Sequence, residues 1–160
     1  MNAIDLLTHQ HRHIEHLFDR LGRIPTSEGA ARGDVFAQLA DALATHIALE
    51  EENLYPRAAA FRRPDAQSEA LAEHELFKQL LADLLQCEPG EPEFEVKLFE
   101  LRDRLELHVE EEEAELFPAL EQLIEEPELL ELGLAMAEQA RERSLSPEGE
   151  ITPALEPSFS

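Results

Sequence analysis

Apolar side chains recur every three or four residues along four long stretches of the chain, which is the spacing of one buried face of an α-helix. Segments that contain proline or glycine separate these stretches and mark their ends. The pattern therefore predicts four long amphipathic helices, over about residues 2–22, 34–61, 65 to the segment CEPGEP, and 93–126.

Single residues refine where these helices begin and bend. Asp34 is expected to cap the second helix. Pro56 and Pro118 each remove a backbone hydrogen bond, so the second and fourth helices should bend or end there. Pro127 suits the first turn of a shorter fifth helix. The apolar face of that helix would contain Leu130, Leu134 and Ala137. Residues 146–160 hold three prolines and no periodicity, which predicts a disordered tail.

The composition is typical of an all-α protein with a single core, because alanine, leucine and glutamate dominate and 43% of the 160 residues are hydrophobic. The net charge of −23 argues against nucleic acid and anionic membranes as partners, since clustered lysine and arginine bind phosphate groups. No apolar run approaches the ~20 residues of a membrane span. The single cysteine and the absence of a visible secretory signal favour a cytoplasmic protein without an internal disulfide.

Two histidine–glutamate motifs carry the most specific chemistry. His46-x3-Glu50 and His108-x3-Glu112 continue in similar ways, as HIALEEENLYP and HVEEEEAELFP. A lone histidine precedes the motifs by 35 and 34 residues, respectively, so the chain is a tandem of two halves. Residues four apart share one face of a helix, so each motif places an imidazole and a carboxylate one turn apart.

Helical angles separate inward from outward histidines. The lone histidines, His11 and His74, fall within the apolar stripes of their helices, as do both motifs. By contrast, His9, His13 and His16 lie on the solvated side of the first helix. A buried carboxylate is costly unless it is paired or bound to a metal, so the inward set predicts a metal site. The acidic neighbours of the second motif are expected to face solvent: Glu110, Glu111 and Glu113.

The order of these residues, with the LYP and LFP continuations, resembles the hemerythrin-like (HHE cation-binding) family over about residues 5–125. The resemblance implies an up-down-up-down antiparallel four-helix bundle. This bundle would span residues 1–126, followed by the short fifth helix at 127–145 and the tail at 146–160. The resemblance also implies a non-heme diiron centre. Carried over by position, its ligands are His11, His46, Glu50, His74, His108 and Glu112.

The donor chemistry suits iron but also zinc or manganese, so ligand type alone does not choose the metal. We expect two iron ions, bridged by both glutamates and by an oxo or hydroxo group, with two histidines on each iron. Each iron would then have about five bonds, one fewer than octahedral coordination requires. The vacancy would admit a diatomic ligand or peroxide. We therefore expect a protein that binds, senses or detoxifies O2, NO or peroxide, and leave open whether it is an enzyme.

Three residues near the expected ligands are candidates for tuning the centre. Oxygen-carrying members of the family have a second histidine four residues after His74, whereas this chain has Lys78 there. Glu15 either pairs with Lys78 beside the metals or acts as an extra ligand, and Lys78 alternatively extends to the surface. Tyr55 is placed to hydrogen-bond near the site. The lysine favours reactivity or sensing over oxygen carriage.

Two other functions stay open. Relatives with a similar ligand set store or deliver iron or repair damaged iron centres, and usually carry an additional cysteine-bearing domain. The acidic bundle is alternatively a cargo or interaction module that docks through its C-terminal region. The sequence does not determine the oligomeric state, and a homodimer is one alternative.

Overall fold

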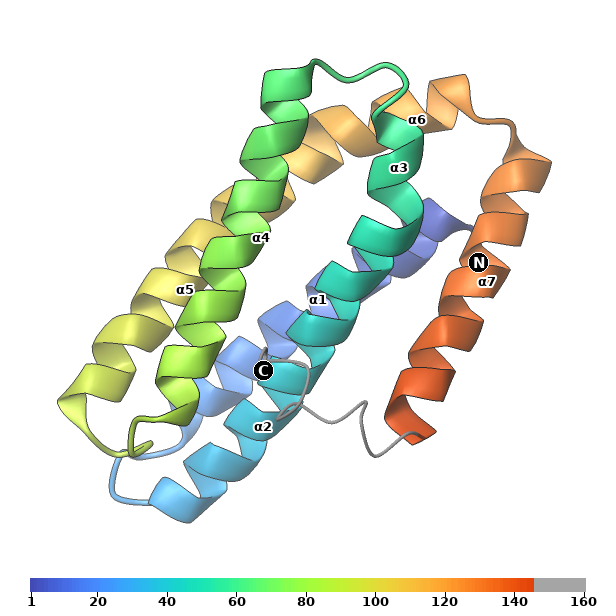
Figure 1. The fold of residues 1–160 in the computed structure, drawn as a ribbon. Coiled ribbons are helices and arrows are strands. Elements are labelled where there is room, and N and C mark those ends of the chain that lie inside the picture. The colour runs from blue at the N-terminus through green and yellow to red at the C-terminus, as the bar shows by residue number, and fades with distance from the viewer. Residues whose placement is uncertain (146–160) are drawn as a thin grey trace.

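The computed structural model describes residues 1–145, so the predicted tail at 146–160 lies outside the described residues. Within the described part, the regular secondary structure is helical throughout, as the composition predicts. Figure 1 shows four long helical stretches side by side, with the chain turning back between them. They are α1 (Ala3–Arg23), α2–η1–α3 (Gly29–Leu49, Glu50–Leu54, Tyr55–Ala58), α4 (Pro64–Leu85) and α5–η2–α6 (Pro92–Glu111, Glu112–Leu116, Phe117–Leu123).

Three of these stretches begin where the sequence supplies a start signal. Asn2 Oδ1 accepts a hydrogen bond from the Asp5 backbone N–H at 2.8 Å, and the Asn2 N–H donates to the Asp5 carboxylate at 3.3 Å. This reciprocal cap satisfies two donors that an isolated α1 would leave free. Pro64 and Pro92 begin α4 and α5, where a missing N–H costs little.

The second stretch begins at Gly29, so the prediction of a cap at Asp34 is wrong. The buried side chain of Arg32 explains the earlier start. It donates hydrogen bonds to the carbonyl oxygens of Leu21 at 3.2 Å and Ile24 at 2.8 Å, at the end of α1. Carbonyl groups at a helix end have free acceptor capacity. This tertiary contact outweighs the low helix propensity of the glycines.

The prolines inside the second and fourth stretches are accommodated by π-helical turns. The segment η1 precedes Pro56, and η2 precedes Pro118. In each turn, the N–H of the residue before the proline bonds to the carbonyl five residues earlier, which belongs to Glu50 or Glu112. The predicted bend is therefore a local widening of the helix, a feature that is common at functional sites. It begins at the glutamate of each repeated motif.

The fifth helix, α7 (Glu126–Leu145), begins within one residue of the predicted range 127–145, but it is not short and it buries a different face. It has 20 residues, the same as α5. Leu129, Leu132 and Met136 are buried, whereas Leu130 and Leu134 are 41% and 69% exposed. Apolar residues occupy several angles of this helix, so its contact with α1, rather than its sequence pattern, decides which face is buried.

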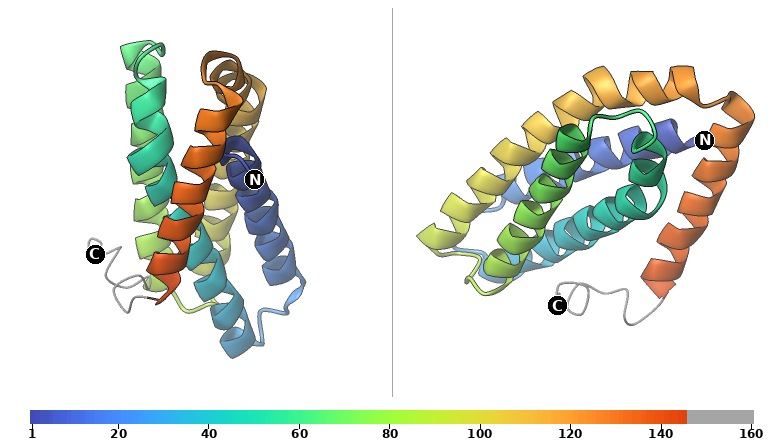
Figure 2. Two further views of the ribbon diagram at one scale, coloured as in Figure 1. Left: turned by 90° about the vertical axis from the view of Figure 1, so that its right-hand side faces the viewer. Right: turned by 45° about the horizontal axis from the view of Figure 1, so that its top comes forward.

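Gly133 brings α7 into backbone contact with the start of α1. A Cβ atom at this position would lie 2.5 Å from the Met1 carbonyl oxygen and 2.7 Å from the Asn2 carbonyl carbon. Only glycine fits so close an approach. The left view of Figure 2 shows α7 crossing beside the N-terminus.

A buried polar layer separates two apolar clusters. Along α1, His11 lies between Leu7 of one cluster and Ile14 of the other. The polar layer holds the four inward histidines and both motif glutamates, all of them at most 3% exposed. None of the helices within residues 1–145 is long and apolar enough to cross a bilayer.

Candidate metal centre

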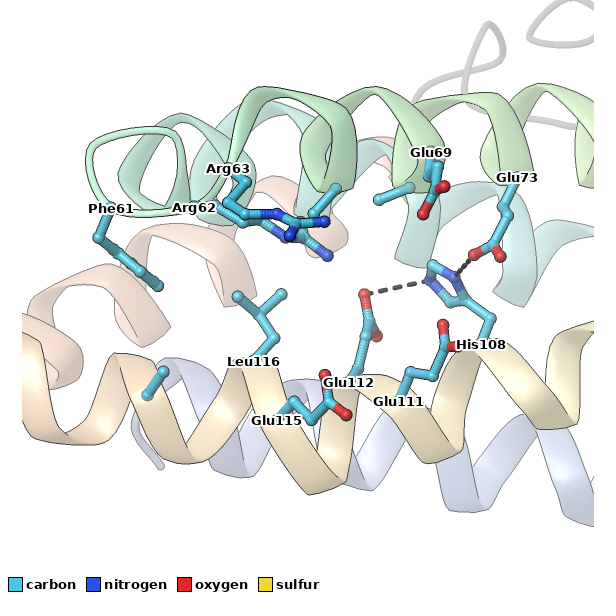
Figure 3. A pocket seen from close by; sticks show the side chains of 13 residues that line it. Phe61, Arg62, Arg63, Glu69, Glu73, His108, Glu111, Glu112, Glu115 and Leu116 are labelled. Carbon is cyan, nitrogen blue, oxygen red and sulfur yellow. Dashed lines mark hydrogen bonds and ion pairs between the residues drawn. The ribbon is translucent and has the colours of Figure 1, made fainter.

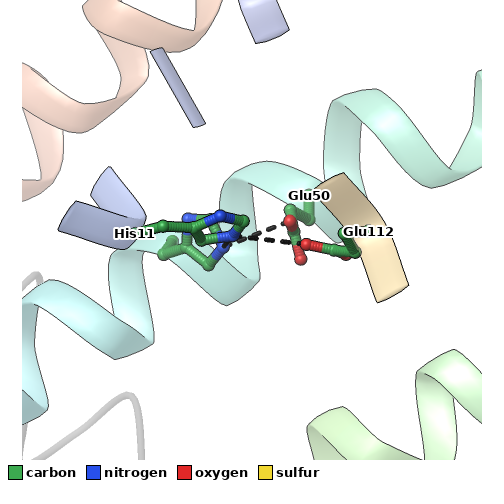
Figure 4. Close-up of side chains that lie close together, drawn as sticks. His11, Glu50 and Glu112 are labelled. Carbon is green, nitrogen blue, oxygen red and sulfur yellow. Dashed lines mark hydrogen bonds and ion pairs between the residues drawn. The ribbon is translucent and has the colours of Figure 1, made fainter. Parts of the chain in front are cut away.

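Each of the four long stretches contributes one histidine to the polar layer. His11 comes from α1, His46 from α2, His74 from α4 and His108 from α5. The two motif glutamates are the first residues of η1 and η2. The structure thus brings together all six residues that the sequence nominated as ligands. Figure 4 shows three of them pointing toward one another: His11, Glu50 and Glu112.

The first group of donors, subsite 1, consists of His11, His46, Glu50 and Glu112, with ligand atoms within 4.8 Å of one another. His11 Nε2 lies 3.3 Å from Glu112 Oε1, and His46 Nε2 lies 3.1 Å from Glu50 Oε2. Both of these buried oxygens lack a partner with hydrogen-bond geometry among the described residues. Buried carboxylate oxygens without partners are costly. A cation between these four side chains would satisfy them.

The second group, subsite 2, consists of Glu50, His74, His108 and Glu112. His74 Nε2 lies 3.0 Å from Glu50 Oε1, and His108 Nε2 lies 3.1 Å from Glu112 Oε2. Each glutamate therefore directs one oxygen to each subsite, as carboxylates shared by two metal ions do. Imidazole and carboxylate donors in this number fit iron, manganese or zinc.

Residues that the sequence analysis did not identify hold the rings of subsite 1. His11 Nδ1 lies 2.7 Å from Glu113 Oε2, and His46 Nδ1 lies 2.7 Å from Gln10 Oε1. Such contacts fix the orientation of a metal-binding imidazole and raise its basicity. The expectation that Glu113 faces solvent is therefore wrong. Its side chain is 30% exposed and contacts α1, because the π-helical turn η2 changes the angular spacing on which the expectation rested.

The rings of subsite 2 are held in the same way, here by two carboxylates. His74 Nδ1 lies 2.8 Å from Glu51 Oε2, and His108 Nδ1 lies 2.5 Å from Glu73 Oε1. The equivalent contacts in subsite 1 involve one carboxylate and one neutral amide. The imidazoles of subsite 2 consequently have the more anionic surroundings.

These four partners follow the internal repeat. Gln10 and Glu73 immediately precede the lone histidines, and each holds the motif histidine of its own half. Glu51 and Glu113 immediately follow the motif glutamates, and each holds the lone histidine of the opposite half. The repeated unit thus extends one residue beyond each motif. That extension is the sequence signal by which the partners could have been found.

Aromatic residues from the LYP and LFP segments stack on the lone histidines. The Tyr55 ring stacks on His74 with centroids 5.1 Å apart, and the Phe117 ring stacks on His11 at 5.7 Å. The Tyr55 hydroxyl also donates a hydrogen bond to Glu112 Oε2 at 2.7 Å. Burial and the neighbouring carboxylates raise the pKa of Tyr55, so its hydroxyl stays protonated. The predicted place of Tyr55 beside the site is confirmed.

Protons and metal ions compete for these donors. Burial lowers the pKa of His108, but hydrogen bonds to Glu112, Glu50 and Glu73 outweigh it and raise the pKa to about 12. Burial opposes ionisation of Glu50, yet the charge of His46 and the hydrogen bonds of the histidines lower its pKa well below the usual value. A proton therefore occupies the centre of the metal-free protein, and a metal ion must displace it.

Glu15 and Lys78 are not partners. Glu15 Oε2 lies 2.8 Å from Arg12 Nη1, while Lys78 Nζ lies 3.1 Å from Glu75 and 3.4 Å from Glu51. The hypothesis of a Glu15–Lys78 pair is therefore wrong, because each side chain finds a partner on or beside its own helix. Glu15 is absent from both donor groups, whereas Lys78 reaches the site indirectly, through the carboxylate that holds His74.

The remaining histidines of α1 face away from the centre. His9, His13 and His16 are exposed, as their helical angles predict. The local HxHxH pattern therefore contributes only His11 to the buried layer.

Comparisons with known proteins agree with this arrangement. The Hemerythrin HHE cation binding domain family matches residues 2–120. The uncharacterized protein Rv2633c of Mycobacterium tuberculosis is 30% identical over 148 residues, which are 92% of this chain and 90% of that protein. The crystal structure of a hemerythrin HHE cation binding domain-containing protein, a homolog of Rv2633c from Mycobacterium kansasii, has a TM-score of 0.78 and 29% identity. That match covers 89% of this chain and 86% of the other.

A further relative is much longer. A Nostoc protein named DNA nickase is 31% identical over 120 residues, which are 75% of this chain but only 34% of that relative. The family match extends over most of the described residues and includes all six buried donors. This chain belongs to the hemerythrin HHE cation-binding domain family.

Proposed function

We propose that this chain holds two iron ions, one in each subsite, and uses them to bind, sense or detoxify O2, NO or peroxide. The observation that supports this most directly is the pair of four-donor groups that share Glu50 and Glu112. Four buried histidines that direct Nε2 toward two common carboxylates have no simpler structural use, because an apolar layer would cost less to bury.

The proposed reactivity, rather than the donor set, favours iron over zinc. Structural zinc sites are usually closed by four ligands in a tetrahedron, often with cysteine. Here each subsite has two histidines and two shared carboxylates, fewer than the six bonds of octahedral iron, so exogenous ligands have room to bind. When bound, a pair of iron ions supplies the redox chemistry that O2, NO or peroxide requires.

The protein's own residues make the second subsite suited to a reactive ligand. The Tyr55 hydroxyl lies 3.2 Å from His74 Nε2 and donates its proton to Glu112 Oε2, so a hydrogen-bond donor lies beside subsite 2. Glu51 and Glu73 hold the rings of His74 and His108 in place. The apolar clusters on both sides of the polar layer limit access of bulk water.

The proposal includes an antiparallel up-down-up-down arrangement of the four long stretches and a cytoplasmic location. Docking through the fifth helix is less favoured, because α7 buries Leu129, Leu132 and Met136 within the molecule. We do not propose nucleic-acid cleavage either, since a net charge of −23 repels phosphodiesters.

Stopped-flow mixing tests the proposal. Iron-loaded protein, reduced under anaerobic conditions, is mixed separately with O2, NO and hydrogen peroxide, and zinc-loaded protein serves as the control. We expect an absorbance change for at least one ligand with iron and none with zinc. A change that reverses on ligand removal indicates binding or sensing, whereas repeated consumption of peroxide indicates an enzyme. Traces that do not respond to any of the three ligands would contradict the proposal.

A further inference from the structure

A cavity of about 410 Å³ lies between α4 and the α5–η2 stretch and reaches the buried polar layer at subsite 2. His108 and Glu112 line its inner end. Glu112 is only 2% exposed, and its Oε1 atom has no hydrogen-bond partner among the described residues. The cavity thus connects the surface with a buried carboxylate that both subsites share.

Carboxylates from both walls line the outer part of this cavity. Glu69 and Glu73 come from α4, Glu111 from α5 and Glu115 from η2. Figure 3 shows Glu69 and Glu73 on one side of the space, and Glu111 and Glu115 on the other. Of the four, Glu73 is already paired with His108, at 2.5 Å. We call the cavity with these four residues the acidic cavity.

The two arginines of the acidic cavity have partners of their own. Arg62 Nη1 donates to Gln67 Oε1 at 3.2 Å, and its guanidinium carbon lies 5.4 Å from the centre of the Tyr55 ring. Arg63 pairs with Asp65 at 3.0 Å. Figure 3 shows both guanidinium groups between Leu116 and Glu112, whereas Glu69, Glu73 and Glu111 lie nearer to His108. A cation that approaches His108 therefore meets mainly negative charge.

Two other cavities near the centre suit a metal ion less well. The one at His11 and His46 has a volume of only about 20 Å³. This is about the space of one water molecule. The wall of this cavity combines apolar side chains such as Ile14 and Phe18 with the charged Arg102 and two glutamates. A third cavity, of about 190 Å³, carries Lys78 on its wall, together with Arg143 and two glutamates.

We propose that the acidic cavity is the access route by which a hydrated divalent cation, ferrous iron, reaches the buried centre, and that subsite 2 fills before subsite 1. The outer carboxylates concentrate the cation at the opening, since like charges in a cleft focus the local potential. Glu112 then receives it, because this carboxylate faces both subsites. The inference rests on the proposed metal centre and adds to it a direction of filling.

Loading kinetics test the route. Metal-free full-length protein is mixed anaerobically with Fe²⁺ or Co²⁺, and uptake is followed by absorbance at low and high salt. The test variant replaces three outer carboxylates: Glu69→Gln, Glu111→Gln and Glu115→Gln. The control makes the same change in net charge at three exposed positions outside the cavity: Glu110→Gln, Glu121→Gln and Glu131→Gln.

The test variant should load on the order of tenfold more slowly at low ionic strength, and the difference should shrink at high salt. The control should load like the wild-type protein, and all three should reach two metal ions. Equal rates in the test variant and the wild type would overturn the route, as would equal slowing in both variants. A wild-type protein that never takes up two ions would instead contradict the metal centre itself.

A steric variant gives a second, independent measurement. Ala119 lines the acidic cavity without belonging to either donor group, so Ala119→Phe should slow loading without lowering the final metal content. Ala48→Phe narrows the third cavity and is the matched control. Slowing by Ala48→Phe alone would place the route there and overturn the proposal. Two variants test the order of filling, because uptake into the subsite that fills first should appear as the faster phase of loading. His74→Ala, which disrupts subsite 2, should remove this faster phase, whereas His11→Ala should not.

Discussion

Subsite 1 and subsite 2 are built on one plan and differ at three points. In both, two histidines direct Nε2 toward the same pair of glutamates, and each ring is held at Nδ1 by a neighbouring helix. Subsite 2 has the Tyr55 hydroxyl where subsite 1 has the Phe117 ring. It has Glu73 where subsite 1 has Gln10. It also borders a large acidic cavity, whereas subsite 1 borders a small one.

This comparison distinguishes the features that bind a metal ion from those that control its reactivity. The shared features are those that metal ligation needs, namely donor atoms, spacing and ring orientation. The unshared features control proton supply, imidazole basicity and access, which determine reactivity. We therefore expect changes to the shared carboxylates to affect both ions, and changes to the unshared positions to affect only the subsite beside which they lie.

The largest expected effect comes from a shared carboxylate. Glu50→Ala removes one donor from each subsite, so both ions should bind more than about a hundredfold more weakly. Metal analysis after gel filtration should then find well under one ion per chain. Glu110→Gln, at an exposed position in α5, is the control. One tightly bound ion in Glu50→Ala would show that the two subsites are independent.

Removing one histidine should empty only its own subsite. We expect His11→Ala and His74→Ala each to retain one ion, because each variant leaves the opposite group of four donors intact. The exposed His13 supplies a control, His13→Ala, which should retain both ions. Complete metal loss in either of the first two variants would argue against separable subsites.

Exchanging the aromatic residues should alter reactivity rather than metal content. Tyr55→Phe removes the donor to Glu112 Oε2, so reaction with peroxide should slow about tenfold or more while two ions remain bound. The reverse change, Phe117→Tyr, places a hydroxyl beside subsite 1. It tests whether a hydroxyl at this equivalent position also speeds the reaction with peroxide. Stopped-flow rates measure both variants. An unchanged rate in Tyr55→Phe would show that this hydroxyl takes no part in the reaction with peroxide.

A smaller effect is expected from the partners of the rings. Glu73→Gln gives subsite 2 the neutral partner that Gln10 provides in subsite 1, so metal affinity at subsite 2 should fall about tenfold. The reciprocal variant, Gln10→Glu, should strengthen subsite 1. Competition with a chelator measures both. Equal affinities in all three proteins would show that the charge of the partner does not tune the site.

The last prediction concerns the pH dependence of the metal-free protein. The folded-state pKa of His108, about 12, exceeds its unfolded value near 6.5. The resulting stabilisation is complete below pH 6.5 and is lost as the pH rises toward 12. Between pH 7 and 9, the free energy of unfolding should therefore fall by up to about 1.4 kcal/mol per pH unit. Denaturant titrations should give a flatter profile for His108→Gln. The same slope in both proteins would contradict this assignment.

The sequence predicted the ligands better than their surroundings. His11, His46 and Glu50 were placed correctly because a 3.6-residue period fixes the side of a helix on which a residue lies. The partners of the rings come from other helices, and helix-to-helix contacts depend on packing that no single-helix period contains. The start of α2 and the buried face of α7 differ from the prediction for the same reason. Arg32 and Gly133 act through contacts with other helices.

The most direct test of the central claim is the metal content of anaerobically purified protein, combined with its visible spectrum before and after exposure to air. We predict two iron ions per chain and a charge-transfer band that appears on oxidation. Substoichiometric zinc with no spectral response to air would contradict the account, whatever the geometry of the six donors.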